Sequence, residues 1–148
     1  MEDSAGVAGL LWDRWLPVAV RTLIAEALPG EEADGRVLAV WLAGVHDSGK
    51  ATPAFACQVD GLADAMRDQG LEMRSRQAMG CDRRLAPHGL AGQSLLGEWL
   101  EDRCGWAPGR TGQFTVAVGA HHGTPPEHGQ IKAAFAHEEL LRTPGPSA

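Results

Sequence analysis

Two pairs of adjacent residues in this 148-residue chain could bind metal, namely His46 with Asp47 and His121 with His122. A further histidine, His88, lies between the two pairs. Each of these imidazoles opens or closes an apolar run, and a helix end has backbone groups that need partners, so capping would explain any one of them. Four such histidines together with an aspartate favour a metal site, because neutral imidazole and carboxylate together suit first-row divalent ions.

The adjacency of the two residues within each pair limits how they can bind an ion. Consecutive residues of a regular helix point about 100° apart, so an adjacent pair cannot easily bind one small ion. A pair at a helix end that is released by a glycine can splay, and Gly49 and Gly123 follow the two pairs closely. Asp47 has two oxygens and can bridge two ions. Two ions roughly 4 Å apart would activate a water and stabilise both the attacking and leaving oxygens of a phosphodiester. These residues therefore indicate phosphoester hydrolysis.

Helices must position these side chains, since apolar residues recur at helical spacing along most of the chain. The sequence predicts an all-α fold without strand pairs or repeats. Proline and glycine clusters mark its breaks, the segment "LPGEEADG" is predicted to be an acidic loop, and residues 67–84 a loop or broken helix with a mildly basic face. The helices are expected over 4–28 with a break at Pro17, over 37–45, from Thr52 towards Met66, and over 90–104, 114–122 and 131–141, before a disordered tail at 142–148.

The aromatic residues are assigned mainly to the core. Trp15, Trp41 and Trp99 lie on apolar faces and are predicted to be buried, whereas Trp106 lies in a loop and is the one ring expected to be exposed. His128 and His137 fall outside the histidine pattern and are predicted to lie on the surface. Ser48 lacks the surroundings of a nucleophile and is expected to cap a helix end.

Composition excludes several classes of protein. No run approaches the roughly 18 apolar residues of a membrane span, and no signal-peptide pattern is visible, so the chain is expected in the cytoplasm. The three cysteines are widely spaced, which disfavours a disulfide framework or a zinc knuckle. The net charge of −6 argues against gripping nucleic acid with the whole surface, although a local basic patch is compatible with it. The length suits one domain over residues 1–148.

The order His-Asp, His, His-His is the metal signature of the HD phosphohydrolase superfamily. The stretches "LAGVHDSGKATPAF", "APHGLAGQSLLGEWL" and "VGAHHGTPP" resemble the HD nuclease domain that precedes or partners the helicase of type I CRISPR interference. The likeness covers roughly residues 2–126. It implies a prokaryotic, all-helical nuclease for antiviral defence that degrades single-stranded DNA delivered by a CRISPR-associated helicase and a crRNA-guided surveillance complex.

The resemblance also implies a role for each matching residue. His46 and Asp47 would be metal ligands, with Asp47 bridging two ions and taking part in catalysis. His88, His121 and His122 would complete the shell of the second ion. Lys50 would be catalytic and substrate-binding by neutralising phosphate charge, although an ordinary solvated lysine is the simpler alternative. The cofactor would be one or two divalent transition-metal ions, with Fe, Mn, Co or Ni expected before Zn or Mg.

The sequence departs from the family pattern at two places. The family opens with H-x-x-D-S/T, and here only Asp3 and Ser4 match it. The family also closes its site with an aspartate well beyond the His-His pair, and neither Glu138 nor Glu139 stands in a matching motif. The domain is therefore expected to be truncated at both ends. Two alternatives stay open, a non-catalytic remnant or assembly module and an HD hydrolase of small nucleotides.

Overall fold

The computed structural model describes residues 1–143, and these form ten α-helices and two short 3-10 helices. No strand occurs within this range, so the predicted all-α fold is confirmed. The chain divides into two compact units. The first comprises Met1–His46, and the second begins at Asp47.

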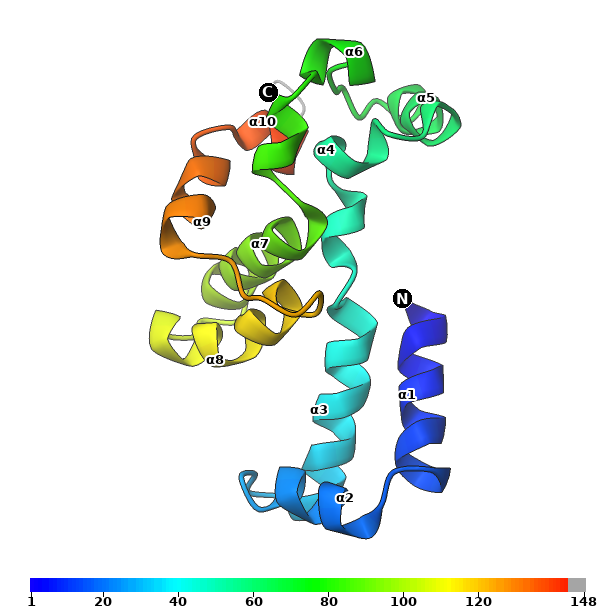
Figure 1. Cartoon of the computed structure of the whole chain (residues 1–148), viewed down its shortest axis with the longest axis vertical. Helices are drawn as coiled ribbons and strands as arrows, with labels where there is room; N and C mark the ends of the chain where they lie inside the picture. The colour runs from blue at the N-terminus through cyan, green and yellow to red at the C-terminus, as the bar shows by residue number, and fades with distance from the viewer. Residues whose placement is uncertain (144–148) are drawn as a thin grey trace. The chain divides into compact units, whose positions relative to one another are not determined.

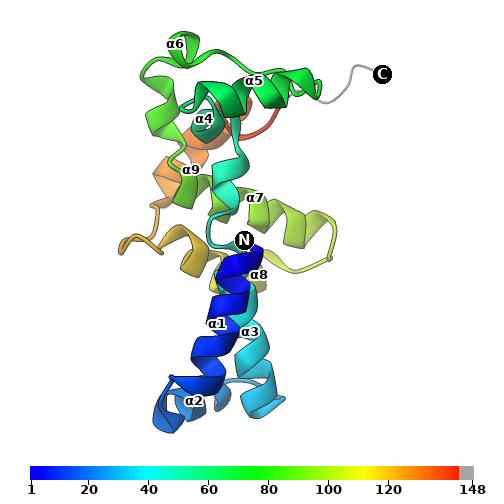
Figure 2. The same ribbon diagram turned by 90° about the vertical axis from the view of Figure 1, so that its right-hand side faces the viewer.

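The first unit is built from three helices, α1 (Glu2–Arg14), α2 (Val18–Ala25) and α3 (Glu31–Val45). Helix α1 lies along α3, and the shorter α2 connects their ends (Figures 1 and 2). Trp12 anchors this packing, because its side chain is only 3% exposed. The ring fits against Gly35 of α3, where a Cβ would approach the Trp12 ring to 2.8 Å. A glycine at this point therefore lets the two helices meet closely.

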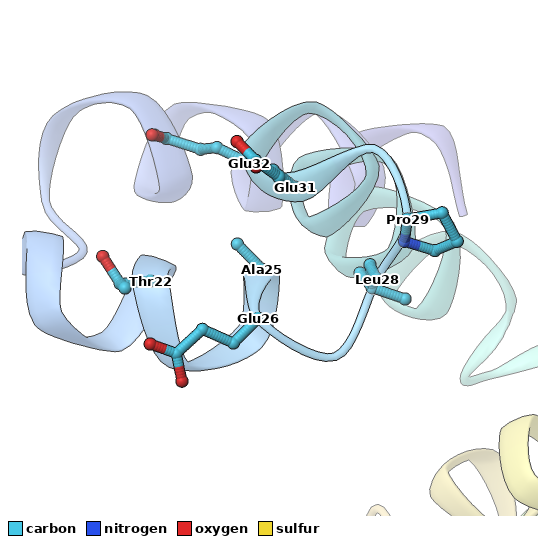
Figure 3. Close-up of a pocket in the computed structure, with 7 residues that line it drawn as sticks. All are labelled: Thr22, Ala25, Glu26, Leu28, Pro29, Glu31 and Glu32. Atoms are coloured by element: carbon cyan, nitrogen blue, oxygen red, sulfur yellow. The ribbon is translucent and has the colours of Figure 1, made fainter.

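An acidic pocket of about 470 Å³ lies where α2 is joined to α3. Figure 3 shows Glu26 on one side of this pocket and Glu31 and Glu32 on the other. Arg21 offsets part of this charge, since its Nη1 donates to Glu32 Oε1 at 2.7 Å. The carboxylates of Glu26 and Glu31 remain, and they make this pocket unsuitable for a phosphate.

The second unit is organised around α7 (His88–Asp102), which packs along α8 (Pro108–Gly119) and against η1 (Ser48–Ala51). Figures 1 and 2 show α7 and α8 side by side. The largest fully buried side chains of the second unit include Met79, Leu140 and Leu141. They belong to one apolar core together with Leu90 of α7. The remaining elements are α4 (Pro53–Ala56), α5 (Asp60–Asp68), α6 (Arg76–Met79), η2 (Asp82–Leu85), α9 (His128–Phe135) and α10 (Glu138–Leu141).

Several boundaries differ from the sequence-based expectation. The predicted break near Pro17 is confirmed. The prediction of an acidic loop at "LPGEEADG" is wrong, because "EEADG" forms the first turns of α3, where the carboxylates complement the helix dipole. Pro53 stands at the first position of a helix as predicted, but that helix ends at Ala56 and a new one starts at Asp60. Residues 67–84 do form a broken helix, as expected.

The last two predicted helices also need correction. Helix α8 starts at Pro108, inside the stretch predicted to be a break, since proline is well suited to the first turn of a helix. It ends at Gly119 and not at His122. The expected helix over 131–141 is split into α9 and α10 by a turn at Ala136 and His137.

Trp15, Trp41 and Trp99 were predicted to be buried, and this prediction is wrong for Trp15 and Trp99. Trp15 is 74% exposed and Trp99 53% exposed, whereas Trp41 is partly buried. Trp15 lies just past the end of α1 and is exposed there, and Trp12 takes the buried place instead. Trp106 is half-buried, because Arg110 lies over its ring at 4.5 Å and Phe114 contacts it edge-on.

Part of the predicted C-terminal tail can be described. Arg142 Nη2 donates to Glu98 Oε2 at 2.6 Å, which ties the start of this segment to α7. Residues 144–148 of the predicted tail lie outside the described range. Within residues 1–143, none of the helices is both long and apolar enough to cross a bilayer.

Candidate metal centre

Three imidazoles converge in the second unit. His88 Nε2 lies 3.2 Å from His121 Nε2 and 2.8 Å from His122 Nε2. One ligand atom from each of these residues lies within 4.8 Å of the others, and this is the one cluster of metal-ligand type within residues 1–143. The structure thus brings together the three histidines that the sequence assigned to one ion.

Asp47 faces this cluster with one of its two oxygens. Asp47 Oδ1 lies 3.4 Å from His88 Nε2 and 3.7 Å from His121 Nε2. The other oxygen, Oδ2, accepts from Lys50 Nζ at 2.7 Å. Lys50 therefore contacts the carboxylate directly, and it also lies 5.9 Å from the centre of the Phe55 ring. In this arrangement Oδ1 of Asp47 faces the histidines, and Oδ2 faces Lys50.

The backbone fixes the orientation of His121. Its Nδ1 lies 2.6 Å from the carbonyl oxygen of Val118 in the last turn of α8. Because a carbonyl oxygen can only accept, Nδ1 carries the proton and the lone pair is left on Nε2, the atom that points at His88. A hydrogen bond of this kind commonly orients metal-binding imidazoles.

His121 and His122 can face the same point because neither belongs to regular helix. Both follow the last residue of α8, and their ring centres lie 4.0 Å apart. Gly123, with φ of +108°, completes the turn in a backbone conformation that other residues rarely adopt. The predicted splaying of this pair at a helix end is what the structure shows.

Gly49 has a different role from the one predicted. Its backbone lies directly against the first turns of α7, where a Cβ would come within 2.6 Å of the amide nitrogen of Gly92 and still closer to the carbonyl oxygen of His88. A glycine at 49 is therefore required for η1 to approach α7. This close approach carries Asp47 to His88.

A second close approach joins α7 to α8. A Cβ on Gly89 would lie 3.0 Å from the carbonyl oxygen of Gly119, and the position of a Cβ on Gly119 is filled by the Gln93 side chain. The packing of these two glycines places the end of α8, and with it His121, beside His88. Sequence reasoning missed these contacts, although the glycines in "PHGLAGQ" and "VGAHH" were a visible signal for them.

Partial burial keeps His88 suited to bind metal. Its side chain is 19% exposed, and Phe55 packs edge-on against its ring at 5.4 Å. Burial lowers the pKa of His88, the neighbouring His122 lowers that pKa further, and Asp47 acts in the opposite direction. The neutral imidazole that a metal requires is therefore favoured.

The donor set fits a divalent transition metal. Metal–nitrogen bonds of about 2.1 Å place tetrahedral donors about 3.4 Å apart, and the imidazole nitrogens lie at 2.8 and 3.2 Å. Small adjustments would thus admit an ion held by His88, His121 and His122, with Asp47 as a fourth donor. Imidazole-rich sites suit Fe, Co, Ni and Zn better than Mg or Ca.

His46 belongs to the first unit, at the end of α3. Its Nδ1 lies 2.7 Å from the carbonyl oxygen of Ala43, so the proton is on Nδ1 and the lone pair is on Nε2, as in His121. The contribution of His46 to a metal site stays a prediction. Outside the cluster, His128 is exposed and His137 is partly exposed and lies 3.5 Å from Glu139.

The family model described as "Cas3, HD domain" matches residues 1–143. The chain belongs to the Cas3 HD domain family. The CRISPR-associated nuclease/helicase Cas3 of Streptococcus thermophilus is 33% identical over 137 residues. That alignment covers 84% of this chain and 14% of the relative.

The fold of this Cas3 HD domain also matches a solved structure. A structure described as "Crystal structure of CRISPR-associated protein" is similar with a TM-score of 0.74 at 30% identity, over 93% of this chain and 15% of that one. The chain thus spans about one seventh of the length of each relative. The HD helical fold predicted from the sequence is confirmed.

Proposed function

We propose that this chain is a metal-dependent nuclease domain that cuts single-stranded DNA in type I CRISPR interference. The observation that carries the proposal is the convergence of His88, His121 and His122 with Asp47, in a chain of the Cas3 HD family. As the chain spans only 14% of the Streptococcus thermophilus relative, a CRISPR-associated helicase and a crRNA-guided surveillance complex are the proposed partners. We expect them to deliver the strand.

The proposed cofactor is one or two divalent transition-metal ions, with Fe, Mn, Co or Ni expected before Zn or Mg. His88, His121, His122 and Asp47 would hold the ion in the second unit, and His46 is the proposed ligand of another. A bound ion of this kind supplies a hydroxide near neutral pH and neutralises charge on the phosphoryl oxygens.

The protein's own groups complete the proposed reaction. The proton on Nδ1 of His121 is shared with Val118, which keeps the Nε2 lone pair directed at the site. Lys50 Nζ, with 44% of its side chain exposed, is accessible to a phosphate as well as to Asp47. It would offset the charge that builds up on a phosphodiester during attack. Asp47 thus contacts Lys50 through Oδ2, and Oδ1 would be its donor to the metal.

A nuclease assay on the purified chain tests the proposal. The chain is stripped of metal, reloaded with manganese or cobalt, and incubated with a fluorescently labelled single-stranded oligonucleotide. We expect divalent-dependent cleavage that falls at least about a hundredfold in His88→Ala and in Asp47→Ala, since each loses a metal ligand. His128→Ala is the matched control, because this exposed histidine lies outside the cluster.

Two results would overturn the proposal. Bound metal without cleavage of DNA or nucleotides would identify a non-catalytic HD module. Turnover of nucleoside mono- or triphosphates, with single-stranded DNA left intact, would identify a hydrolase of small nucleotides.

A further inference from the structure

A second pocket of about 510 Å³ opens in the second unit, beside α6 and η2. Two guanidinium groups, those of Arg76 and Arg83, line it together with the carboxylate of Asp60, so its lining carries a net positive charge. Polar side chains complete the wall. The full lining consists of Asp60, Ser75, Arg76, Gln77, Gly80 and Arg83, and we name it the arginine pocket.

The two arginines of this pocket differ from others nearby. Arg67 is neutralised by Asp64 at 2.7 Å, and Arg74 by Asp82 at 3.0 Å. In contrast, neither Arg76 nor Arg83 forms an ion pair with any carboxylate in the part of the chain that the structure describes. Their charge is therefore available to an anion from outside.

Arg83 is also held in place. Its Nη1 donates to Gln58 Oε1 at 2.9 Å, a neutral partner that fixes the side chain without cancelling its charge. A guanidinium has five N–H donors in a planar fork, so this bond leaves donors for a phosphate oxygen. Pre-positioning of this kind lowers the entropy cost of binding an anion.

The local charge contrasts with that of the whole chain. Residues 74–84 contain four arginines and one aspartate, a balance of +3, whereas the chain carries −6. A phosphate-bearing ligand would therefore be drawn to this segment and repelled by most of the remaining surface.

The arginine pocket is close to the metal centre along the chain. Four residues separate Arg83 from His88, and η2 ends only two residues before the first turn of α7. The five Cα–Cα steps from Arg83 to His88 span at most about 18 Å even when fully extended. A short length of a nucleic-acid strand would bridge this distance.

We propose that the arginine pocket binds a backbone phosphate of the single-stranded nucleic acid that is cut at the histidine cluster. This inference rests on the proposed nuclease function. Arg76 and Arg83 would contact the phosphate without reading the bases, so binding would position the strand and be independent of its sequence. The required basic patch is local, which reconciles nucleic-acid binding with an acidic protein.

Binding is measured on the full 148-residue chain by fluorescence anisotropy, with a labelled oligothymidylate of about twelve nucleotides and EDTA to prevent cleavage. The double variant Arg76→Gln with Arg83→Gln is compared with Arg67→Gln with Arg142→Gln. The control removes the same charge from arginines that already have carboxylate partners. Thermal unfolding of both proteins establishes that each is folded.

We expect the pocket variant to raise Kd about tenfold at low salt. The slope of log K against log salt should fall by about 0.7, since each single-strand phosphate contact contributes about 0.7 and the variant loses one. The control variant should change the Kd and the salt slope much less than the pocket variant does. Equal loss in both double variants, or no measurable binding by the unchanged chain at low salt, would overturn the phosphate site.

Two further arms separate the possible sources of failure. Inorganic phosphate is titrated into the unchanged chain and the pocket variant, and tight phosphate binding without any difference in oligonucleotide affinity would overturn the strand as the ligand. Cleavage by the metal-loaded proteins is measured in parallel. If the pocket variant cuts as fast as the unchanged chain at limiting DNA, the phosphate site is wrong and the proposed nuclease function is unaffected. If the unchanged chain and both double variants bind the strand but none of them cuts it, the proposed nuclease function is wrong.

Discussion

Substituting Gly49 by alanine tests how the metal centre is assembled. The added Cβ would lie 2.6 Å from the amide nitrogen of Gly92, and ordinary contact requires about 3.4 Å, so η1 and α7 must separate by about 0.8 Å or more. Asp47 and His88 lie on opposite sides of this contact. Because ligand positions in metal sites tolerate only about 0.2 Å, we expect metal affinity to fall roughly 10- to 100-fold. Overpacking should also cost about 1–3 kcal/mol of unfolding free energy.

Isothermal titration of manganese or cobalt into stripped protein measures the affinity, and thermal unfolding measures the stability. Gly61→Ala and Gly112→Ala are matched controls, because a Cβ at either position meets nothing within 4 Å. Both lie within helices, where alanine should stabilise by about 0.5–1 kcal/mol. Unchanged metal affinity in Gly49→Ala would refute the idea that this glycine contact brings the carboxylate to the histidines.

Two further predictions concern individual side chains. Trp12→Ala should destabilise the chain by about 3–5 kcal/mol, since this ring is 3% exposed, whereas Trp15→Ala at 74% exposure should change stability by less than about 0.5 kcal/mol in denaturant unfolding. Lys50→Met frees Asp47 Oδ2 and removes a positive charge beside the site, so metal affinity should rise by up to about fivefold while cleavage slows. A drop in metal affinity in titrations of this variant would show instead that Lys50 holds Asp47 in its binding position.

The helical character of the chain was readable from its apolar spacing, but several helix ends were not. The acidic residues after Gly30 looked like a solvated loop, yet they form the first turn of α3, where backbone N–H groups favour negative charge. Pro108 and the glycine after it looked like a break and instead start α8. In both cases the local composition suited a helix start as well as a loop, and packing decided between them.

The candidate site was predicted in its members and only partly in its contacts. Residue types and order identified His88, His121 and His122, which the structure brings together. The direct pairing of Lys50 with Asp47 was not anticipated, because the sequence gives no measure of which oxygen a lysine will reach. It places a positive charge directly beside the carboxylate that is expected to bind metal.

The glycines beside the ligands explain why the motif is longer than its chemistry requires. Asp47, His88 and His121 each lie within two residues of a glycine that another segment approaches closely. These are Gly49 against α7, Gly89 against the end of α8, and Gly119 against the Gln93 side chain. A ligand set supplied by separate segments is only as accurate as the packing between those segments. Side chains larger than hydrogen at these positions would separate the segments and leave every ligand present but out of reach of a common ion. The motif "HDSGK" therefore encodes both a donor and the contact that positions it, and substitution of the glycine should weaken metal binding roughly 10- to 100-fold although every ligand is still present.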